Sequence, residues 1–203
     1  MTCLPPECVL FGVDFGSRYA GTTVIAVYEP FKIYFLSCKK EEDADAFIEQ
    51  SAIHFSPDCI FLDAPLSLPG RYVGLEGFDD YFYRKADIQC GAMSPMFLGG
   101  LTARAIRLRD KLALMGIFVF ETYPKLLASE LDLLVLGYKK DKTHLQTCRA
   151  KIASLFNPAI SLKESSIESW HHFDALLALM SAMKYICKKA SALGDQKEGL
   201  IFY

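Results

Sequence analysis

Residues 9–27 read VLFGVDFGSRYAGTTVIAV, and this stretch predicts a buried strand, a tight turn and a second strand that returns beside the first. The apolar run ends at Asp14, and Gly16 and Gly21 allow the backbone to turn sharply next to that carboxylate. A hairpin whose aspartate caps its own turn is the simplest interpretation of such a pattern. Carboxylates that end later elements of the chain favour another interpretation, in which Asp14 belongs to a shared acidic site.

The composition fits a compact domain that spans residues 1–203, because the chain is 52% hydrophobic and 23% charged. No apolar run approaches the ~18 residues that a membrane span needs, and the start does not resemble a signal peptide. The seven cysteines are scattered, without a Cys-x-x-Cys pair, so we expect reduced thiols in a cytoplasmic protein. The net charge of −2 argues against a uniformly basic surface but is compatible with a local basic groove.

The order of the predicted elements indicates a mixed α/β fold. A third strand, at residues 33–37, completes an antiparallel meander, and residues 41–55 have the spacing of a surface helix. Two later apolar strands end in Asp63 and Glu121, and a helix from residue 94 to about residue 115 separates them. The remainder is mostly helical, with a last long apolar helix predicted near residues 167–192. No interface between copies of the chain is visible in this pattern.

Carboxylates therefore end three predicted strands, and one more lies in the last helix, where His171 precedes it by three residues on the same face. Like charges that are close together cost stability unless a cation lies between them. Enzymes that cleave phosphodiesters commonly offset this repulsion with two divalent metals ~4 Å apart. Oxygen ligands suit Mg²⁺ or Mn²⁺. The predicted metal ligands and catalytic residues are Asp14, Asp63, Glu121 and Asp174, with His171 as a further ligand or proton shuttle.

Each of these residues also has a structural interpretation. Asp63 precedes Ala-Pro and can be a turn former, and Glu121 can pair with a nearby arginine. A histidine in the last helix is more often a packed residue than a ligand. Asp174 is harder to explain in this way, because a lone carboxylate in an apolar helix is costly without a partner.

The segment at residues 67–91 is a long loop rich in glycine, proline and aromatic residues, and loops of this length are often functional. We expect it to lie over the acidic site as a substrate lid, although a loop packed by its aromatic residues is the alternative. The candidate substrate-binding residues are Arg84, Lys85, Asp87, Arg104 and Lys139.

Several of these motifs together resemble a known family. The first hairpin and the stretch HHFDALLALMSAM are similar to the first hairpin and last catalytic helix of the RNase H-like superfamily. With IFLDAPLSLPG, RKADIQCGAMSP and FVFETYP, they resemble the domain of unknown function four-two-nine, a family of predicted nucleases. The resemblance covers nearly the whole chain. It implies an RNase H-like mixed sheet of five strands, three antiparallel and then two parallel, flanked by helices.

The resemblance also implies a divalent-metal-dependent nuclease or phosphodiesterase that acts on DNA or RNA. It makes Asp14 the ligand of the first strand and Asp174 the ligand of the last helix, and it matches Arg84 and Asp87 to the Arg-x-x-Asp of the loop. His171 and His172 depart from the family, which usually has acidic residues there. Two alternatives stay open, namely a non-catalytic nucleic-acid or protein-binding module and an ATPase of the actin and sugar-kinase type, which needs a second similar half.

Overall fold

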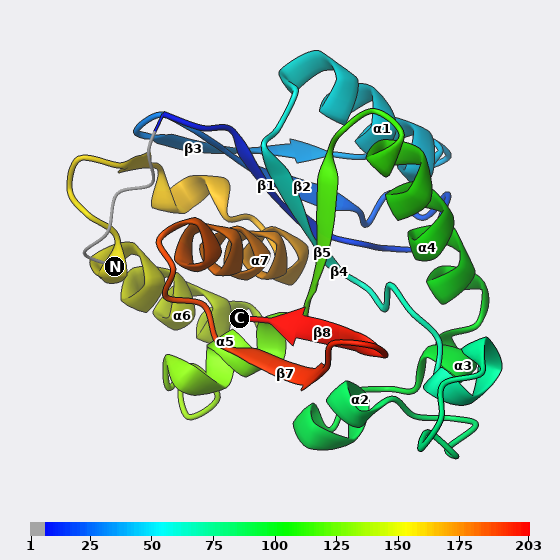
Figure 1. Ribbon diagram of the computed structural model, residues 1–203. Coiled ribbons are helices and arrows are strands. Elements are labelled where there is room, and N and C mark those ends of the chain that lie inside the picture. Colours follow the sequence, from blue (N-terminus) through cyan, green and yellow to red (C-terminus); the bar gives the residue numbers. More distant parts are fainter. Residues whose placement is uncertain (1–6) are drawn as a thin grey trace.

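The computed structural model describes residues 7–203 and contains one mixed sheet of eight strands with helices on both faces (Figure 1). The strand order across the sheet is β6-β3-β2-β1-β4-β5-β8-β7. The strands are β1 (Leu10–Asp14), β2 (Val24–Glu29), β3 (Lys32–Ser37), β4 (Cys59–Asp63), β5 (Phe118–Thr122), β6 (Ser161–Leu162), β7 (Ala192–Asp195) and β8 (Gly199–Phe202). The α-helices are α1 (Ala44–Phe55), α2 (Lys85–Cys90), α3 (Pro95–Leu98), α4 (Gly100–Ala113), α5 (Pro124–Glu130), α6 (Lys142–Leu155) and α7 (Trp170–Ile186).

The five central strands have the order and directions that the sequence predicts. β1, β2 and β3 form the antiparallel meander, and β4 and β5 continue the sheet in parallel on the other side of β1. The expectation of five strands is nevertheless wrong, because the sheet has eight among the described residues. Two residues of β6 extend the edge at β3, and the β7–β8 hairpin extends the edge at β5. The two residues of β6 are too few to form an apolar run from which to predict a strand.

Two hydrophobic clusters cover the two faces of the sheet. On one face, α5, α6 and α7 pack over side chains such as Leu10 and Phe61. On the other face, α1 and α4 pack over side chains such as Phe11 and Leu62. Successive residues of a strand point to opposite faces, so the alternation within β1 and β4 assigns each side chain to one cluster. The same alternation determines which carboxylates at the strand ends lie close together.

Helix α7 lies directly against β1, and Gly12 makes this contact possible. A Cβ atom built on Gly12 would lie 2.0 Å from the backbone nitrogen of Leu179 and 2.4 Å from the carbonyl oxygen of Ala175. Any side chain at position 12 would therefore collide with helix backbone. Because Gly12 has no side chain, α7 can lie close to β1. The first turns of α7 then pass the carboxyl end of β1.

Four predicted helices are shorter in the structure than expected, or are divided. The helix expected from residue 94 is divided into α3 and α4 at Gly99, whose φ of 48° does not continue a helix. The sequence predicts a helix from residue 123 to about residue 136, but α5 ends at Glu130 and is followed by turns. Helix α7 covers residues 170–186 of the expected 167–192. The expected helix at residues 41–55 begins at Ala44, after the N-cap Asp43.

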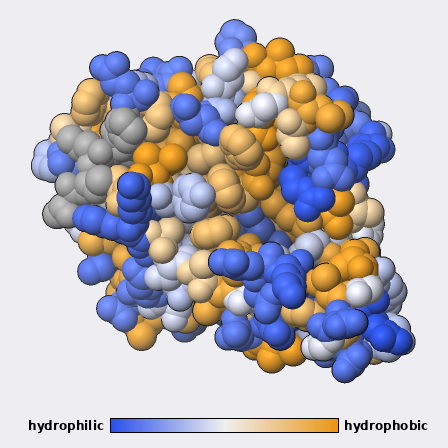
Figure 2. Space-filling model, in the orientation of Figure 1, coloured by the Kyte–Doolittle hydropathy of each residue, from blue (hydrophilic) through white to orange (hydrophobic). Residues whose placement is uncertain are grey.

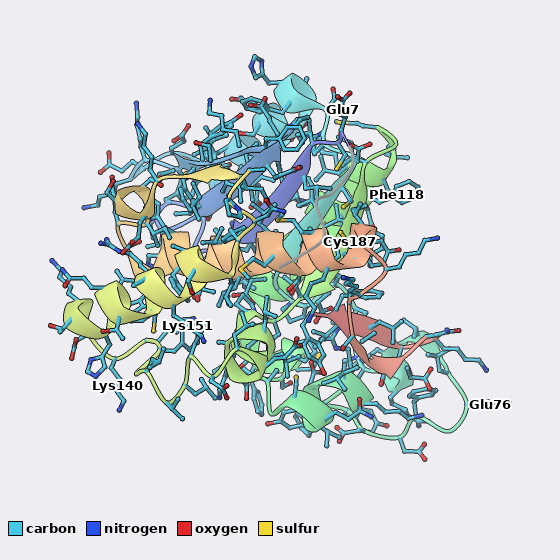
Figure 3. The ribbon with its side chains drawn as sticks, turned by 90° about the vertical axis from the view of Figure 1, so that its left-hand side faces the viewer. Glu7, Glu76, Phe118, Lys140, Lys151 and Cys187 are labelled. Atoms are coloured by element: carbon cyan, nitrogen blue, oxygen red, sulfur yellow. The ribbon has the colours of Figure 1, made fainter. Side chains whose placement is uncertain are left out.

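Cys187 lies just after the end of α7 (Figure 3). It is disulfide-bonded. The expectation that all the cysteines are reduced thiols is therefore wrong at this position. Five other cysteines are free, and Cys3 lies outside the described residues. Within residues 7–203, no helix has both the length and the apolar character needed to cross a membrane.

Candidate metal centre

The candidate site begins at the carboxyl ends of two neighbouring strands. Asp14 ends β1 and Asp63 ends β4, and the parallel pairing makes these two residues direct Cα partners. Both side chains therefore point to the same face of the sheet, the face that α7 covers. The prediction that Asp14 and Asp63 lie at adjacent strand ends is confirmed.

Helix α7 adds a third carboxylate, Asp174, from its second turn. Carboxylate oxygens of Asp14, Asp63 and Asp174 all lie within 4.8 Å of one another. Side chains of three elements thus converge on one small space. Three carboxylates at this separation offer the oxygen donors that hard divalent cations such as Mg²⁺ and Mn²⁺ prefer. We call Asp14, Asp63 and Asp174 the aspartate cluster.

The aspartate cluster is electrostatically unfavourable without a cation. Burial raises the pKa of Asp63 well above its usual range, and the nearby charges of Asp14 and Asp174 raise it further. Burial also raises the pKa of Asp174 to about 6, against the opposing effect of Lys139. Asp63 makes no hydrogen bond or ion pair with another residue in the described range 7–203. Its carboxylate is therefore free to act as a cation ligand, and a bound cation would favour its charged form.

Lys139 lies at the aspartate cluster and is the one predicted substrate-binding residue that the structure places there. Its ammonium nitrogen is 2.5 Å from Oδ2 of Asp174, while its side chain is still 51% exposed. Tyr138 donates a hydrogen bond of 2.5 Å to Oδ1 of the same carboxylate. Burial disfavours the charged form of Lys139, but the three aspartates outweigh this effect and raise its pKa. In this arrangement both oxygens of Asp174 are occupied by donors from the chain.

The two histidines of α7 have different surroundings. Nδ1 of His171 is 2.7 Å from Oδ2 of Asp14, and this hydrogen bond raises the pKa of His171. His172 instead lies between Ser37 and Ser169, at 3.2 Å and 2.8 Å, and burial lowers its pKa. Of the two histidines, His171 is therefore the one in contact with the aspartate cluster, which agrees with its predicted position.

Glu121 is not part of the aspartate cluster, although the sequence groups it with the other carboxylates. The register pairs Glu121 with Leu62, one residue before Asp63. A shift of one residue turns a strand side chain to the opposite face of the sheet, so Glu121 points away from α7. It forms an ion pair of 2.6 Å with Arg84 and accepts a hydrogen bond of 2.8 Å from the backbone of Leu66. Pairing with an arginine, the structural interpretation of Glu121, is what the structure shows.

Arg84 is not available to bind phosphate, contrary to the prediction. Its side chain is 0% exposed and pairs with Asp87 and Glu121, each at 2.6 Å. All five guanidinium N–H groups are used, since Nε donates to Asp87, Nη1 to Ser67 and Glu121, and Nη2 to Asp87 and Glu121. Asp87 is equally buried in the same contact. We call Arg84, Asp87 and Glu121 the buried ion triad.

The other two predicted phosphate contacts, Lys85 and Arg104, also lie in ion pairs away from the aspartate cluster. Lys85 is half-exposed and pairs with Asp195 of β7 at 3.2 Å. Arg104 of α4 pairs with Asp45 at 2.6 Å and lies over the ring of Phe15. These contacts connect secondary-structure elements, and neither residue contacts a carboxylate of the aspartate cluster.

The long loop at residues 67–91 is fixed to the rest of the domain by hydrogen bonds and does not form a mobile lid. Glu198 accepts hydrogen bonds of 2.7 Å from the backbone nitrogens of Gly70 and Lys85, and Arg84 joins the loop to β5. The tip of the loop, near Glu76, lies at the outer edge of the molecule (Figure 3). The expected lid over the acidic site is therefore not formed by this loop.

Two residues of the site are not recognised in the sequence analysis. Tyr138 anchors Asp174 and packs against Trp170 and Phe173, but its only signal is that it precedes Lys139. Gly12 lies two residues before Asp14, on the face that α7 covers, and its signal is a glycine inside a buried strand. Such a glycine often marks a close backbone approach.

The raised pKa values predict how the stability of the metal-free protein changes with pH. Groups with a raised pKa hold protons in the folded state that they lose on unfolding, so stability falls as the pH rises. The fall begins near the unfolded aspartate pKa of about 3.9 and continues to the folded pKa of Asp174, about 6. We expect the free energy of unfolding, measured with urea in the presence of a chelator, to show this fall in the wild-type protein. The fall should be smaller in Asp63→Asn, because that variant lacks one of the titrating groups. Identical profiles of the two proteins between pH 4 and pH 7 would contradict the raised pKa of Asp63.

Comparisons with known proteins add little to this geometry. No protein-family model matches the chain, and no curated protein matches its sequence. Membership in the domain of unknown function four-two-nine is therefore not supported by a family match. Among solved structures, the Thermus thermophilus RuvC structure is similar with a TM-score of 0.40 and 11% identity, over 88% of this chain and 96% of that chain. A likeness this distant carries no argument, and the functional proposal is based on the aspartate cluster.

Proposed function

We propose that this protein is a divalent-metal-dependent phosphodiesterase that acts on nucleic acid and has an RNase H-like fold. The observation that carries the proposal is the aspartate cluster, in which three strand and helix ends bring carboxylate oxygens within 4.8 Å of one another. An arrangement that destabilises the metal-free protein is expected at a functional site rather than at a purely structural one. The central strand order is the one that the RNase H-like resemblance implies.

Asp14, Asp63 and Asp174 are the residues that would hold the metal. Bound there, Mg²⁺ or Mn²⁺ would stabilise the negative charge that develops on the oxygens of a phosphodiester during cleavage. Asp63 is ready to bind because no hydrogen bond or ion pair within the described chain occupies its carboxylate. With a metal bound, Asp174 would contact it in place of Lys139, which would free the ammonium group of Lys139.

His171 and Lys139 are the groups that could act on substrate beside the carboxylates. The raised pKa of His171 keeps its imidazole protonated over a wider pH range, so it can deliver a proton to a leaving oxygen. The ammonium of Lys139 has a flexible, half-exposed side chain that can reach a phosphate once it leaves Asp174. We assign His171 the role of proton donor and Lys139 that of a phosphate contact.

The test is an assay of metal binding and cleavage with the wild-type protein. We expect Mn²⁺ or Mg²⁺ to raise the melting temperature, because a ligand that binds only the folded state stabilises it. We also expect cleavage of a labelled oligonucleotide in the same metal and none in a chelator, with single-stranded, duplex and branched substrates compared side by side. Na⁺ at the same ionic strength is the control for nonspecific ionic effects.

The outcomes separate the functional alternatives. Stabilisation by metal together with cleavage supports the phosphodiesterase. Metal binding without cleavage of any of the three substrates would favour the non-catalytic module instead. No change in melting temperature at millimolar Mn²⁺ would contradict the metal site itself.

A further inference from the structure

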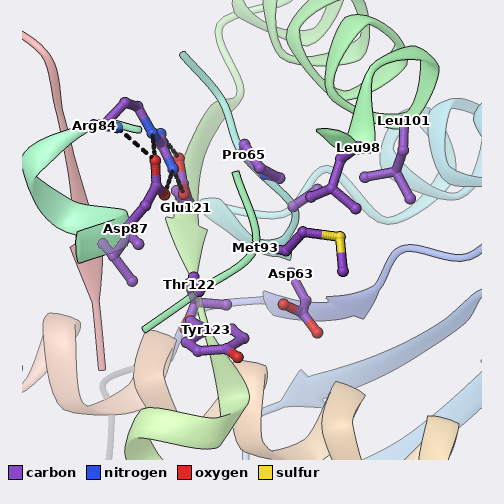
Figure 4. A pocket seen from close by; sticks show the side chains of 13 residues that line it. Asp63, Pro65, Arg84, Asp87, Met93, Leu98, Leu101, Glu121, Thr122 and Tyr123 are labelled. Atoms are coloured by element: carbon purple, nitrogen blue, oxygen red, sulfur yellow. Dashed lines mark hydrogen bonds and ion pairs between the residues drawn. The ribbon is translucent and has the colours of Figure 1, made fainter. Parts of the chain in front are cut away.

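A small pocket opens beside the aspartate cluster, between the ends of β4 and β5 and the segment from α2 to α4 (Figure 4). Its volume is about 220 Å³, below the ~300–1,000 Å³ of typical small-molecule sites. It therefore suits a single small group better than a whole nucleotide. The apolar side chains that line it include Pro65, Met93, Leu98, Leu101 and Ile201.

The charged groups of the pocket leave no cation free inside it. The buried ion triad forms one wall, and all five donors of Arg84 are used within the protein (Figure 4). Asp63 forms another part of the lining and carries or can carry negative charge. A phosphate or carboxylate would therefore enter without a partner and against a carboxylate, which is costly. The occupant is therefore expected to be uncharged.

One polar group in the lining is available to an occupant. The hydroxyl of Tyr123 makes no hydrogen bond with any residue in the described part of the chain, although Tyr123 is partly buried next to Asp63 (Figure 4). Burial raises the pKa of Tyr123, so the hydroxyl stays neutral and can donate one hydrogen bond. The ring of the same residue offers a flat surface. An uncharged aromatic ring with polar edges satisfies both features.

The position of the pocket connects it to the proposed reaction. Asp63 belongs both to the pocket lining and to the aspartate cluster, so a group in the pocket lies next to a phosphate held by the cluster. Met93 at the pocket is 60% exposed, and Figure 2 shows further hydrophobic surface among hydrophilic residues over the α2–α3 region. A strand that approaches the cluster thus meets an apolar opening beside it.

We propose that this pocket receives one unpaired nucleobase of the strand whose phosphodiester lies at the aspartate cluster. The inference rests on the proposed function and narrows its substrate to nucleic acid with an unstacked nucleotide at the cleavage point. Enzymes that hold a single base in a pocket pay less to unstack it when it is already unpaired or mismatched. Single-stranded or mismatched substrates are therefore preferred over perfect duplex.

The test is a binding scan with short single-stranded oligonucleotides in Ca²⁺, each with one abasic nucleotide at a different position. We expect one position at which removal of the base weakens binding by about tenfold, equal to about 1.4 kcal/mol. Leu98→Trp, which fills the pocket, is expected to weaken binding of the intact strand and to bring the ratio of intact to abasic affinity close to one. Leu114→Trp, at a residue that is 90% exposed after α4, is the matched control and keeps the ratio.

Two results would overturn the pocket proposal. One is a scan in which no abasic position weakens binding. This scan uses only the wild-type protein, so its outcome does not depend on whether a variant folds. The other is a Leu98→Trp protein with a wild-type melting temperature and an unchanged affinity ratio, which would place the base elsewhere. Cleavage in Mn²⁺ is measured separately. Cleavage with binding that does not depend on any base would overturn the pocket proposal but leave the proposed phosphodiesterase activity intact. Base-dependent binding without cleavage would support the pocket proposal and overturn the proposed activity.

Discussion

Replacing Arg84 by methionine is expected to lower the free energy of unfolding by about 3–5 kcal/mol, as is usual when one partner of a buried ion pair is removed. The guanidinium is fully buried and is the partner of both Asp87 and Glu121. Its loss leaves two buried carboxylates facing each other without a cation, and it also removes the link between the long loop and β5. Urea unfolding followed by circular dichroism measures the change.

Lys85→Met is the control for this measurement, because it removes the neighbouring positive charge. Lys85 is half-exposed and its ion pair with Asp195 is 3.2 Å long. Exposed pairs of this kind are worth about 0–1 kcal/mol, so the two variants should differ by several-fold in their effect. An Arg84→Met protein as stable as Lys85→Met would show that the buried ion triad does not hold the loop. It would also return Arg84 to the group of candidate substrate contacts.

Asp63→Asn is expected to reduce metal-dependent cleavage by about a thousandfold or more. A metal contributes several kcal/mol of charge stabilisation to the transition state, and about 4 kcal/mol corresponds to a thousandfold change in rate. The substitution keeps the shape of the side chain but removes the charge. Because Asp63 has no hydrogen bond or ion pair within the described chain, the metal-free variant should be as stable as the wild type or more stable.

The control for Asp63→Asn is Asp110→Asn, the same substitution at an exposed residue of α4 that pairs with its neighbour Arg109. Initial cleavage rates and the Mn²⁺-induced rise in melting temperature are measured for both proteins. We expect Asp110→Asn to match the wild type in both, and Asp63→Asn to lose both. Wild-type cleavage by Asp63→Asn would remove the aspartate cluster from the reaction, whatever metal the protein binds.

The part of the site that the sequence predicts depends on local patterns. Short apolar runs that end in Asp14 and Asp63 identify both strands and the end at which each carboxylate lies. The apolar last helix identifies Asp174 because a carboxylate there needs a partner. Pairing between β1 and β4 then follows from the order of the elements, since a parallel strand joined through a helix commonly returns beside the first.

The residues that the sequence misplaces depend on strand register and on long-range packing. Glu121 ends an apolar run as Asp63 does, but the register of β5 against β4 is offset by one residue and turns it to the other face. Nothing within five residues of Glu121 indicates this offset. Arg84 likewise has a loop sequence typical of an exposed residue. Its burial results from contacts with Glu121, 37 positions later in the chain.

The contact between Lys139 and Asp174 gives the protein a counterion of its own. With an ammonium group tethered 2.5 Å from one of the three aspartates, the acidic centre is folded and partly neutralised before any ion arrives. The ammonium group is covalently attached, so its effective concentration at the aspartates is very high. An incoming ion must therefore interact with the three carboxylates more strongly than this single charge does. Monovalent ions such as Na⁺ and K⁺ offer no gain over that ammonium, whereas a doubly charged ion does. If the centre binds a cation as proposed, Lys139 therefore favours divalent over monovalent ions.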